Sequence, residues 1–178
     1  MLDSDSGCKS ELSDDITYFY LNDKFYYLVF IIDVYTREVV GYNMSFDMRH
    51  ESNIKALEMA LKQIHPKDRV NMIHHSDCGS QYRSKPYMKM LKDSGIKVSM
   101  EQKAQDNAYA ERINGTIKNE YLKLLNILNY KNLKAKAKKA VTHYNNVRKH
   151  NSLLNGVSPK EFKKITKVSE LKNNLIYN

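Results

Sequence analysis

The sequence predicts an α/β protein with a five-stranded mixed sheet flanked by helices. Three closely spaced runs rich in Tyr, Phe, Val and Ile stand in the first quarter of the chain, as expected of β-strands. Short apolar runs then alternate with segments in which apolar residues recur every three or four positions, the pattern of strands between helices. Hydrophobic residues make up 42% of the 178 residues, enough for one packed domain and too many for a disordered chain.

The three predicted strands that begin the sheet cover residues 15–20, 25–34 and 37–44. Connections of four and two residues separate them. Such short connections join antiparallel neighbours, so we expect a three-stranded meander.

The elements that follow are a helix, a strand, a helix, a strand and two helices. They are predicted at residues 51–64, 70–74, 86–93, 96–100, 107–122 and 132–147. The last of these helices has a predicted apolar stripe formed by Leu133, Ala137, Ala140, Tyr144 and Val147. Both later strands are reached through helical crossovers, which join parallel neighbours, so the sheet is expected to be mixed.

One core domain is expected over residues 14–165. Residues 1–13 contain Ser, Asp and Gly with few apolar side chains and are predicted to be a flexible lead-in, while 166–178 are predicted to be a C-terminal tail. The longest apolar stretch, 26–32, is far too short to cross a bilayer, and no signal-peptide layout precedes it. We therefore expect no membrane association and a cytoplasmic location.

Positive charge is concentrated in the second half of the chain. Residues 1–100 hold 13 Lys and Arg against 14 Asp and Glu, a balance of −1, whereas residues 101–178 hold 16 against 6, a balance of +10. A polyanion such as DNA or RNA is a natural partner for such a surface, because each neutralised phosphate releases counterions. A solvated lysine-rich face that maintains solubility explains the same charge equally well.

Three carboxylates stand where the predicted elements would bring them together. Asp15 lies on the first strand, Asp77 follows the fourth, and Glu111 is on the polar face of a later helix. Only two cysteines occur and the histidines have no zinc-finger spacing, so oxygen atoms are the expected metal ligands. Oxygen ligands suit Mg²⁺ or Mn²⁺, and two such ions promote displacement at phosphorus. On spacing alone, ordinary solvent-facing charge is the commoner explanation.

Five short motifs occur in the order seen in one family. They are Asp15-Ile16-Thr17-Tyr18, Asp33-Val34-Tyr35-Thr36-Arg37 with Val40-Gly41-Tyr42, His75-Ser76-Asp77-Cys78-Gly79-Ser80-Gln81-Tyr82, Asp106-Asn107-Ala108-Tyr109-Ala110-Glu111-Arg112, and Tyr144-Asn145 with Arg148 and His150. The chain resembles the integrase-like catalytic core of bacterial insertion-sequence transposases, the branch of the DDE superfamily similar to retroviral integrases. That resemblance spans roughly residues 14–163 and implies a ribonuclease-H-like fold.

The resemblance also implies a reaction and its residues. Asp15, Asp77 and Glu111 match the three acidic residues that are both catalytic and metal-binding in the family, with two Mg²⁺ or Mn²⁺ ions; Asp14 is the neighbour and not the match. The implied activity is DNA cleavage and strand transfer during transposition. The implied partners are the transposon ends and target DNA, bound by a homodimer or higher oligomer.

Six further residues are predicted to support this site. Those expected to contact DNA are Lys118, Gln81, Lys103 and Arg148. Those expected to support the carboxylates are Asn107, one helical turn before Glu111, and His75. Each has a structural alternative, such as a surface ion pair, a helix cap, or an anchor for the last helix.

Two other readings of the chain remain open at this point. One is a ribonuclease-H-like nuclease that only hydrolyses nucleic acid. The other is an inactive or domesticated core that serves as a nucleic-acid-binding module. Because no helix-turn-helix region precedes the core, we also expect a fragment that binds DNA through phosphates with little sequence preference.

Overall fold

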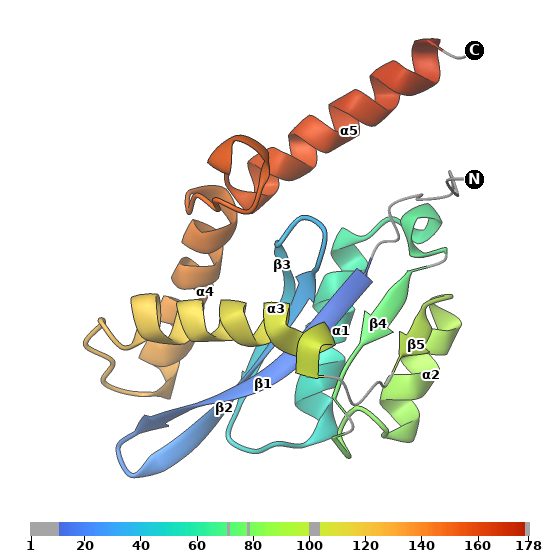
Figure 1. Ribbon diagram of the computed structural model, residues 1–178. Coiled ribbons are helices and arrows are strands. Elements are labelled where there is room, and N and C mark those ends of the chain that lie inside the picture. Colours follow the sequence, from blue (N-terminus) through green and yellow to red (C-terminus); the bar gives the residue numbers. More distant parts are fainter. Residues whose placement is uncertain (1–10, 71, 78, 100–103, 177–178) are drawn as a thin grey trace.

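The computed structural model is described over residues 11–70, 72–77, 79–99 and 104–176, leaving aside the side chains of 104–107 and 168–176. A five-stranded sheet with the order β3-β2-β1-β4-β5 forms its centre (Figure 1). Its strands are β1 (Glu11–Leu21), β2 (Lys24–Asp33), β3 (Val39–Ser45), β4 (Ile73–His75) and β5 (Lys97–Ser99). The predicted five-stranded sheet is confirmed.

The strand directions make the sheet mixed. β1 pairs antiparallel with β2, and β2 antiparallel with β3, which is the predicted meander. β4 lies parallel to β1 on its other side and β5 parallel to β4. The tight turn between β1 and β2 places Asn22 and Asp23 at φ of 51° and 57°, as a type I′ turn requires.

Helices cover both faces of the sheet. They are α1 (His50–Gln63), α2 (Lys85–Asp93), α3 (Ala104–Thr116), α4 (Tyr130–Asn146) and α5 (Pro159–Ile176), with the shorter η1 (Pro66–Arg69), η2 (Ile117–Leu122) and η3 (Leu154–Gly156). In Figure 1, α3 crosses in front of the strands, α1 lies behind them, and α5 leads away from the sheet. Within the described residues, no helix is long and apolar enough to cross a membrane.

Alternation along β2 divides the core into two clusters. Leu28, Phe30 and Ile32 pack with residues of α3 and α4, whereas Val29 and Ile31 pack with residues of α1 and α2. A central strand buried on both faces has this pattern because its side chains alternate direction. The sheet is therefore the middle of three layers.

Gly41 explains how closely α1 approaches β3. A Cβ atom at this position would lie 2.2 Å from the carbonyl oxygen of Ala56 and 3.0 Å from the Cβ of Ala60. Only glycine allows the backbones to come this near. The Val40-Gly41-Tyr42 motif is thus explained here by packing.

Two predicted boundaries in the sequence fall elsewhere in the structure. β1 begins at Glu11, ahead of the predicted start at residue 15, because parallel pairing with β4 starts there. Residues 11–13 therefore belong to the sheet, although they were assigned to the lead-in. At the other end, α5 was not predicted, and it continues through the expected core boundary at residue 165.

The helices also differ in detail from the prediction. The single helix expected over 107–122 is α3 followed by the π-helical η2. In a π-helix each backbone hydrogen bond spans one residue more than in an α-helix. Val147 was assigned to the apolar stripe of α4 but is 58% exposed, because it is the residue that caps this helix and its backbone leaves the helical conformation. The other four stripe residues are buried as predicted.

Candidate active site

Parallel pairing of β1 with β4 places two of the three carboxylates at equivalent positions. Ser13 of β1 is the register partner of His75 of β4. Two residues further along each chain are Asp15 and Asp77. Since neighbouring strands lie about 4.8 Å apart, this register brings the two aspartates to the same end of the parallel pair.

Asp15 is the most firmly held of the three. Its Oδ2 accepts a hydrogen bond of 2.7 Å from the side-chain amide of Asn114 on α3, and its Oδ1 accepts one of 2.8 Å from the backbone N–H of Ile16. Burial raises the pKa of Asp15, the two hydrogen bonds oppose this, and the charges of Glu111 and Asp77 raise it further. The negative charges of Glu111 and Asp77 therefore repel the ionised form of Asp15.

Asp77 is exposed and lies in the loop after β4. Its Oδ1 accepts a hydrogen bond of 2.8 Å from the backbone N–H of Gly79. A Cβ atom on Gly79 would come within 2.7 Å of this same oxygen and 2.5 Å of the side-chain nitrogen of Gln81. A side chain at position 79 would displace the Asp77 carboxylate and the Gln81 amide from the positions they take here.

Glu111 is exposed on α3, the helix that packs across β1. Asn114 lies three residues later in the same helix and is buried, so one turn of α3 carries both a carboxylate and the group that holds Asp15. Among the described residues, no group of three or more His, Cys, Asp or Glu side chains is arranged closely enough to bind a metal ion.

Asp14 lies on the opposite face of β1 and is completely buried. Its Oδ2 accepts a 2.8 Å hydrogen bond from the hydroxyl of Tyr87, which is 3.0 Å from Nε2 of the buried His74. Burial raises the pKa of Asp14 well above its usual range and lowers that of His74 to about 3. Although Asp14 and His74 are 3.5 Å apart, both shifts favour uncharged groups over an ion pair.

The residues predicted to contact DNA lie in different surroundings. Lys118 on η2 is partly buried, with its Nζ 4.2 Å from the centre of the Tyr18 ring, and burial lowers its pKa. Gln81 lies in the Asp77 loop. Arg148 binds the carboxylate of Glu120 through both terminal nitrogens. Lys103 is outside the described residues.

Of the two residues predicted to support the carboxylates, His75 has a described side chain, whereas the side chain of Asn107 lies outside the described residues. The side chain of His75 makes no hydrogen bond with the described residues, and its Nε2 is 3.9 Å from an oxygen of Glu11. The hydrogen bond that holds Asp15 comes from Asn114, for which the sequence predicted no role.

Asn145, from the last family-like motif, is an anchor in the structure. Its side-chain amide accepts a hydrogen bond of 3.0 Å from the N–H of Val39 and donates one of 2.9 Å to the carbonyl of the same residue. These bonds tie α4 to β3.

Two family models match the chain. The model of an integrase core domain matches residues 9–105, more than half of the chain, and a second integrase core domain model matches residues 93–159.

Curated relatives are products of bacterial insertion sequences. The chain is 37% identical over 151 residues to an uncharacterized 31 kDa protein of insertion element IS600 from Shigella sonnei, covering 84% of this chain and 55% of that one. It is 34% identical over 154 residues to a putative transposase of IS150 from Escherichia coli, covering 85% and 53%. The chain spans about half the length of the curated relatives it matches.

Solved structures show the same fold. The catalytic core of HTLV-2 integrase, in complex with magnesium, aligns with a TM-score of 0.68 at 19% identity, covering 86% of this chain and 95% of that one. The simian T-cell lymphotropic virus intasome contains a chain that aligns at the same TM-score and 16% identity, covering 86% and 54%. The predicted ribonuclease-H-like fold is confirmed, and the chain belongs to the integrase core domain family.

Proposed function

We propose that this chain is the catalytic core of a DNA transposase, an enzyme that cuts and joins DNA strands. Its proposed active site consists of the carboxylates of Asp15, Asp77 and Glu111. The observation that carries this proposal is the position of Asp15. Asn114 fixes its carboxylate on the strand, while the charges of Asp77 and Glu111 converge on it from a loop and a helix. Carboxylates that repel one another at a strand end are typical of a site that a cation completes.

The donor set fits a pair of Mg²⁺ or Mn²⁺ ions. All three side chains offer oxygen, the ligand that these hard cations prefer, and the burial and neighbouring negative charges that raise the pKa of Asp15 would be offset by bound positive charge. When bound, such ions activate the attacking hydroxyl and stabilise the leaving oxygen of an in-line displacement at phosphorus. The related HTLV-2 core was solved with magnesium, in dimeric and trimeric forms.

The protein's own groups hold the ligands in place. The amide of Asn114 fixes one oxygen of Asp15 and leaves the other bonded only to its neighbouring N–H. The N–H of Gly79 fixes one oxygen of Asp77. Glu111 lies on the exposed side of α3, one helical turn from Asn114, and would supply the third carboxylate of the ligand set.

DNA is the proposed substrate, in a bacterial cytoplasm. The excess positive charge lies in residues 101–178, the part of the chain that carries Glu111, which favours a polyanion as partner. A homodimer or higher oligomer would bring two DNA ends together.

The test is strand transfer by the intact chain on a pre-cleaved duplex end with Mg²⁺ or Mn²⁺. Glu111→Gln should abolish joining and weaken Mn²⁺ binding, measured by electron paramagnetic resonance of the free ion. Glu58→Gln, which removes the same charge from an exposed position of α1, should leave both unchanged. Equal activity of wild type and Glu111→Gln would refute the assignment. DNA binding without joining in any protein would favour a nucleic-acid-binding module.

A further inference from the structure

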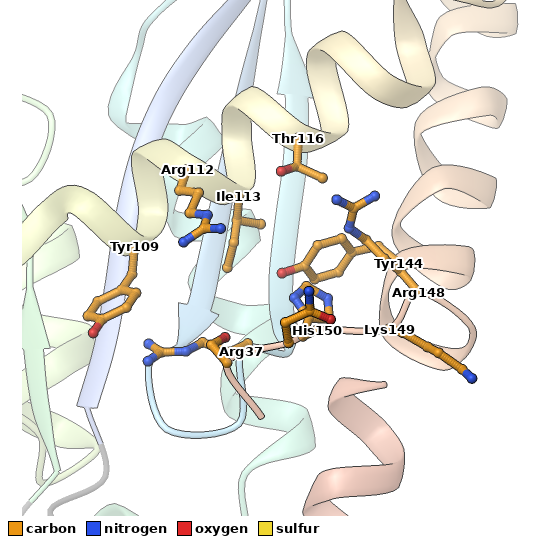
Figure 2. A pocket seen from close by; sticks show the side chains of 11 residues that line it. Arg37, Tyr109, Arg112, Ile113, Thr116, Tyr144, Arg148, Lys149 and His150 are labelled. Carbon is orange, nitrogen blue, oxygen red and sulfur yellow. The ribbon is translucent and has the colours of Figure 1, made fainter. Parts of the chain in front are cut away.

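A cationic pocket lies where α3, the end of α4 and the turn between β2 and β3 meet (Figure 2). Its volume is about 350 Å³. No carboxylate lines it, whereas four cationic side chains do: Arg37, Arg112, Arg148 and Lys149. Such a lining repels cations and attracts an anion.

Arg37 is held in place by the turn that carries it. Asp33 Oδ1 accepts hydrogen bonds of 3.0 Å from the N–H groups of Tyr35 and Thr36, and Arg37 itself adopts a φ of 62°. The central carbon of its guanidinium lies 3.6 Å from the centre of the Tyr109 ring, a cation–π contact. Such a contact uses the positive charge of the guanidinium and leaves N–H donors for a ligand.

Three buried polar atoms of the pocket lining have no hydrogen-bond partner among the described residues. They are Nη1 of Arg37, the hydroxyl of Tyr144 and Nε2 of His150. Tyr144 is completely buried, and its ring meets that of His150 edge-on at 4.9 Å. A buried polar group without a partner costs about 1–3 kcal/mol, so three in one lining indicate that a polar ligand supplies the missing bonds.

The arginine charges reach these groups. Burial raises the pKa of Tyr144, while the charges of Arg148, Arg37 and Arg112 all lower it. The pKa of His150 is lowered by burial and then by the same three arginines, and is raised by the charge of Glu120. Positive charges from three elements therefore act on the same two side chains of the pocket.

Two of the three guanidinium groups are free to bind an anion. Arg148 is engaged by Glu120 through both terminal nitrogens. Within the described residues, neither Arg37 nor Arg112 forms an ion pair with a carboxylate. Arg112 is exposed, and in Figure 2 its side chain lies between Tyr109 and the ring of Tyr144.

We propose that this pocket binds a phosphate group of the DNA backbone, with Arg37 and Arg112 as charged donors and the Tyr144 hydroxyl as a neutral one. The inference rests on the proposed function, because it makes the DNA held at Glu111 the source of the phosphate. Helical spacing places Tyr109 and Arg112 on one flank of α3 and Glu111 on the other, so a strand that crosses the exposed side of this helix can reach both sites. Guanidinium donors match phosphate geometry, and phosphate contacts fix the position of a strand without reading its sequence.

The test is binding of a short duplex to the full chain without divalent metal, followed by fluorescence anisotropy over a range of salt concentrations. Combined Arg37→Gln and Arg112→Gln should weaken binding about 10-fold and lower the salt slope by about 1. The control is combined Lys134→Gln and Lys138→Gln, which removes the same charge from exposed positions of α4. Equal losses in the two double variants would overturn the proposal, because net charge alone would then explain them.

Tyr144→Phe separates binding from folding. It removes an unpartnered buried hydroxyl, so the free energy of unfolding of the free protein should stay the same or rise, while the affinity for the duplex falls several-fold. An unchanged affinity would exclude the hydroxyl as a ligand. Saturation of the pocket by inorganic phosphate, with the duplex affinity of the arginine variant unchanged, would assign the pocket to a free anion and overturn the DNA source.

Failure of the proposed function would look different. Glu58→Gln, which lies outside both the pocket and the three carboxylates, should retain duplex binding in the metal-free assay. Absence of strand transfer together with the expected binding losses would reject the transposase mechanism and support the pocket. Strand transfer by the wild type, together with unaltered duplex binding by the arginine variant, would support the transposase mechanism and reject the pocket.

Discussion

Asp14 and Asp15 are adjacent residues of the same type, and β1 gives them opposite surroundings. Asp15 faces α3, is half-buried, and shares its region with Asp77 and Glu111. Asp14 faces α2, is fully buried, and bonds to Tyr87 next to His74. The alternation of a strand therefore separates a carboxylate that can meet a cation from one that packs uncharged in the core.

The difference shows how environment assigns a role to a carboxylate. Burial raises the pKa of both residues, but for Asp14 by much more, which favours its protonated form. A protonated carboxyl is a poor metal ligand and a good hydrogen-bonding group in an apolar layer. Proximity in sequence to the catalytic position is thus no evidence of catalysis.

The largest expected effect comes from replacing the carboxyl of Asp15 with an amide, and the same change at Asp14 is its control. Asp15→Asn should lower metal-dependent joining by about 10³-fold or more, since it removes about 4 kcal/mol of charge stabilisation. Its free energy of unfolding should stay constant or rise, because the raised pKa means that the ionised carboxylate costs stability at neutral pH. Asp14→Asn mimics the protonated form and should keep joining within a few-fold. Equal losses in strand-transfer assays would end the distinction between the two faces.

A smaller effect is expected where α3 holds Asp15. Asn114→Ala removes the 2.7 Å hydrogen bond to its carboxylate. Joining should fall about 10- to 100-fold, as is typical when a group that orients a metal ligand is lost. Asn119→Ala, an exposed position on η2, is the control. Single-turnover rates check this, and a rate equal to that of the control would show that Asp15 needs no such support.

The pH dependence of stability tests the buried surroundings of Asp14, which include His74. The pKa of His74 falls from 6.5 to about 3, so between these values the unfolded chain binds a proton that the folded chain does not. Stability from this group is present above pH 6.5 and is lost as pH falls, by about 1.4 kcal/mol per pH unit. Asp14 acts in the opposite sense. Because its pKa is raised, the folded chain binds a proton that the unfolded chain does not, and its contribution to stability rises as the pH falls.

The comparison that isolates His74 is with His74→Gln, which retains Asp14. Urea unfolding of both proteins between about pH 7 and about pH 4.5 gives the difference in slope. A variant whose stability falls as steeply as that of the wild type would show that His74 is protonated in the fold.

The smallest effect is expected for Tyr87→Phe. Loss of the hydroxyl leaves Asp14 and His74 with only each other, and the free energy of unfolding should fall by about 1 kcal/mol. Tyr20→Phe removes a hydroxyl of an exposed residue, bonded to Asp23 at 3.0 Å, and should change stability by less than about 0.5 kcal/mol. Equal changes in denaturant midpoints would mean that the buried hydroxyl contributes nothing special.

Much of the fold was predictable because period and turn chemistry are local signals. The meander, the mixed sheet and the helices that became α1, α2 and α4 follow from them. α5 was missed although Ser158, Pro159 and Glu161 form a start signal, with a 3.4 Å bond from the Glu161 N–H to the Ser158 hydroxyl. The early start of β1 depends on pairing with β4, a distant segment whose register no local pattern encodes.

The site was predictable in outline only. Strand ends and helical spacing pointed to Asp15, Asp77 and Glu111, and Asn107 was expected to support Glu111. The pattern did not single out Asn114, whose side chain holds Asp15. Periodicity identifies a face, whereas the residue that reaches a given carboxylate depends on how α3 crosses β1. The same limit hid the cationic pocket, whose lining comes from three separate elements.

The paired bonds between Asn145 and Val39 have a consequence for association. β3 is an edge strand, and the N–H and carbonyl of Val39 both point away from β2 toward Asn145. An open edge of this kind is a template on which another chain can add a strand and begin to aggregate. The amide of Asn145 satisfies the backbone groups of Val39 as a neighbouring strand would, so the docking of α4 closes this end of the β3 edge to strand addition.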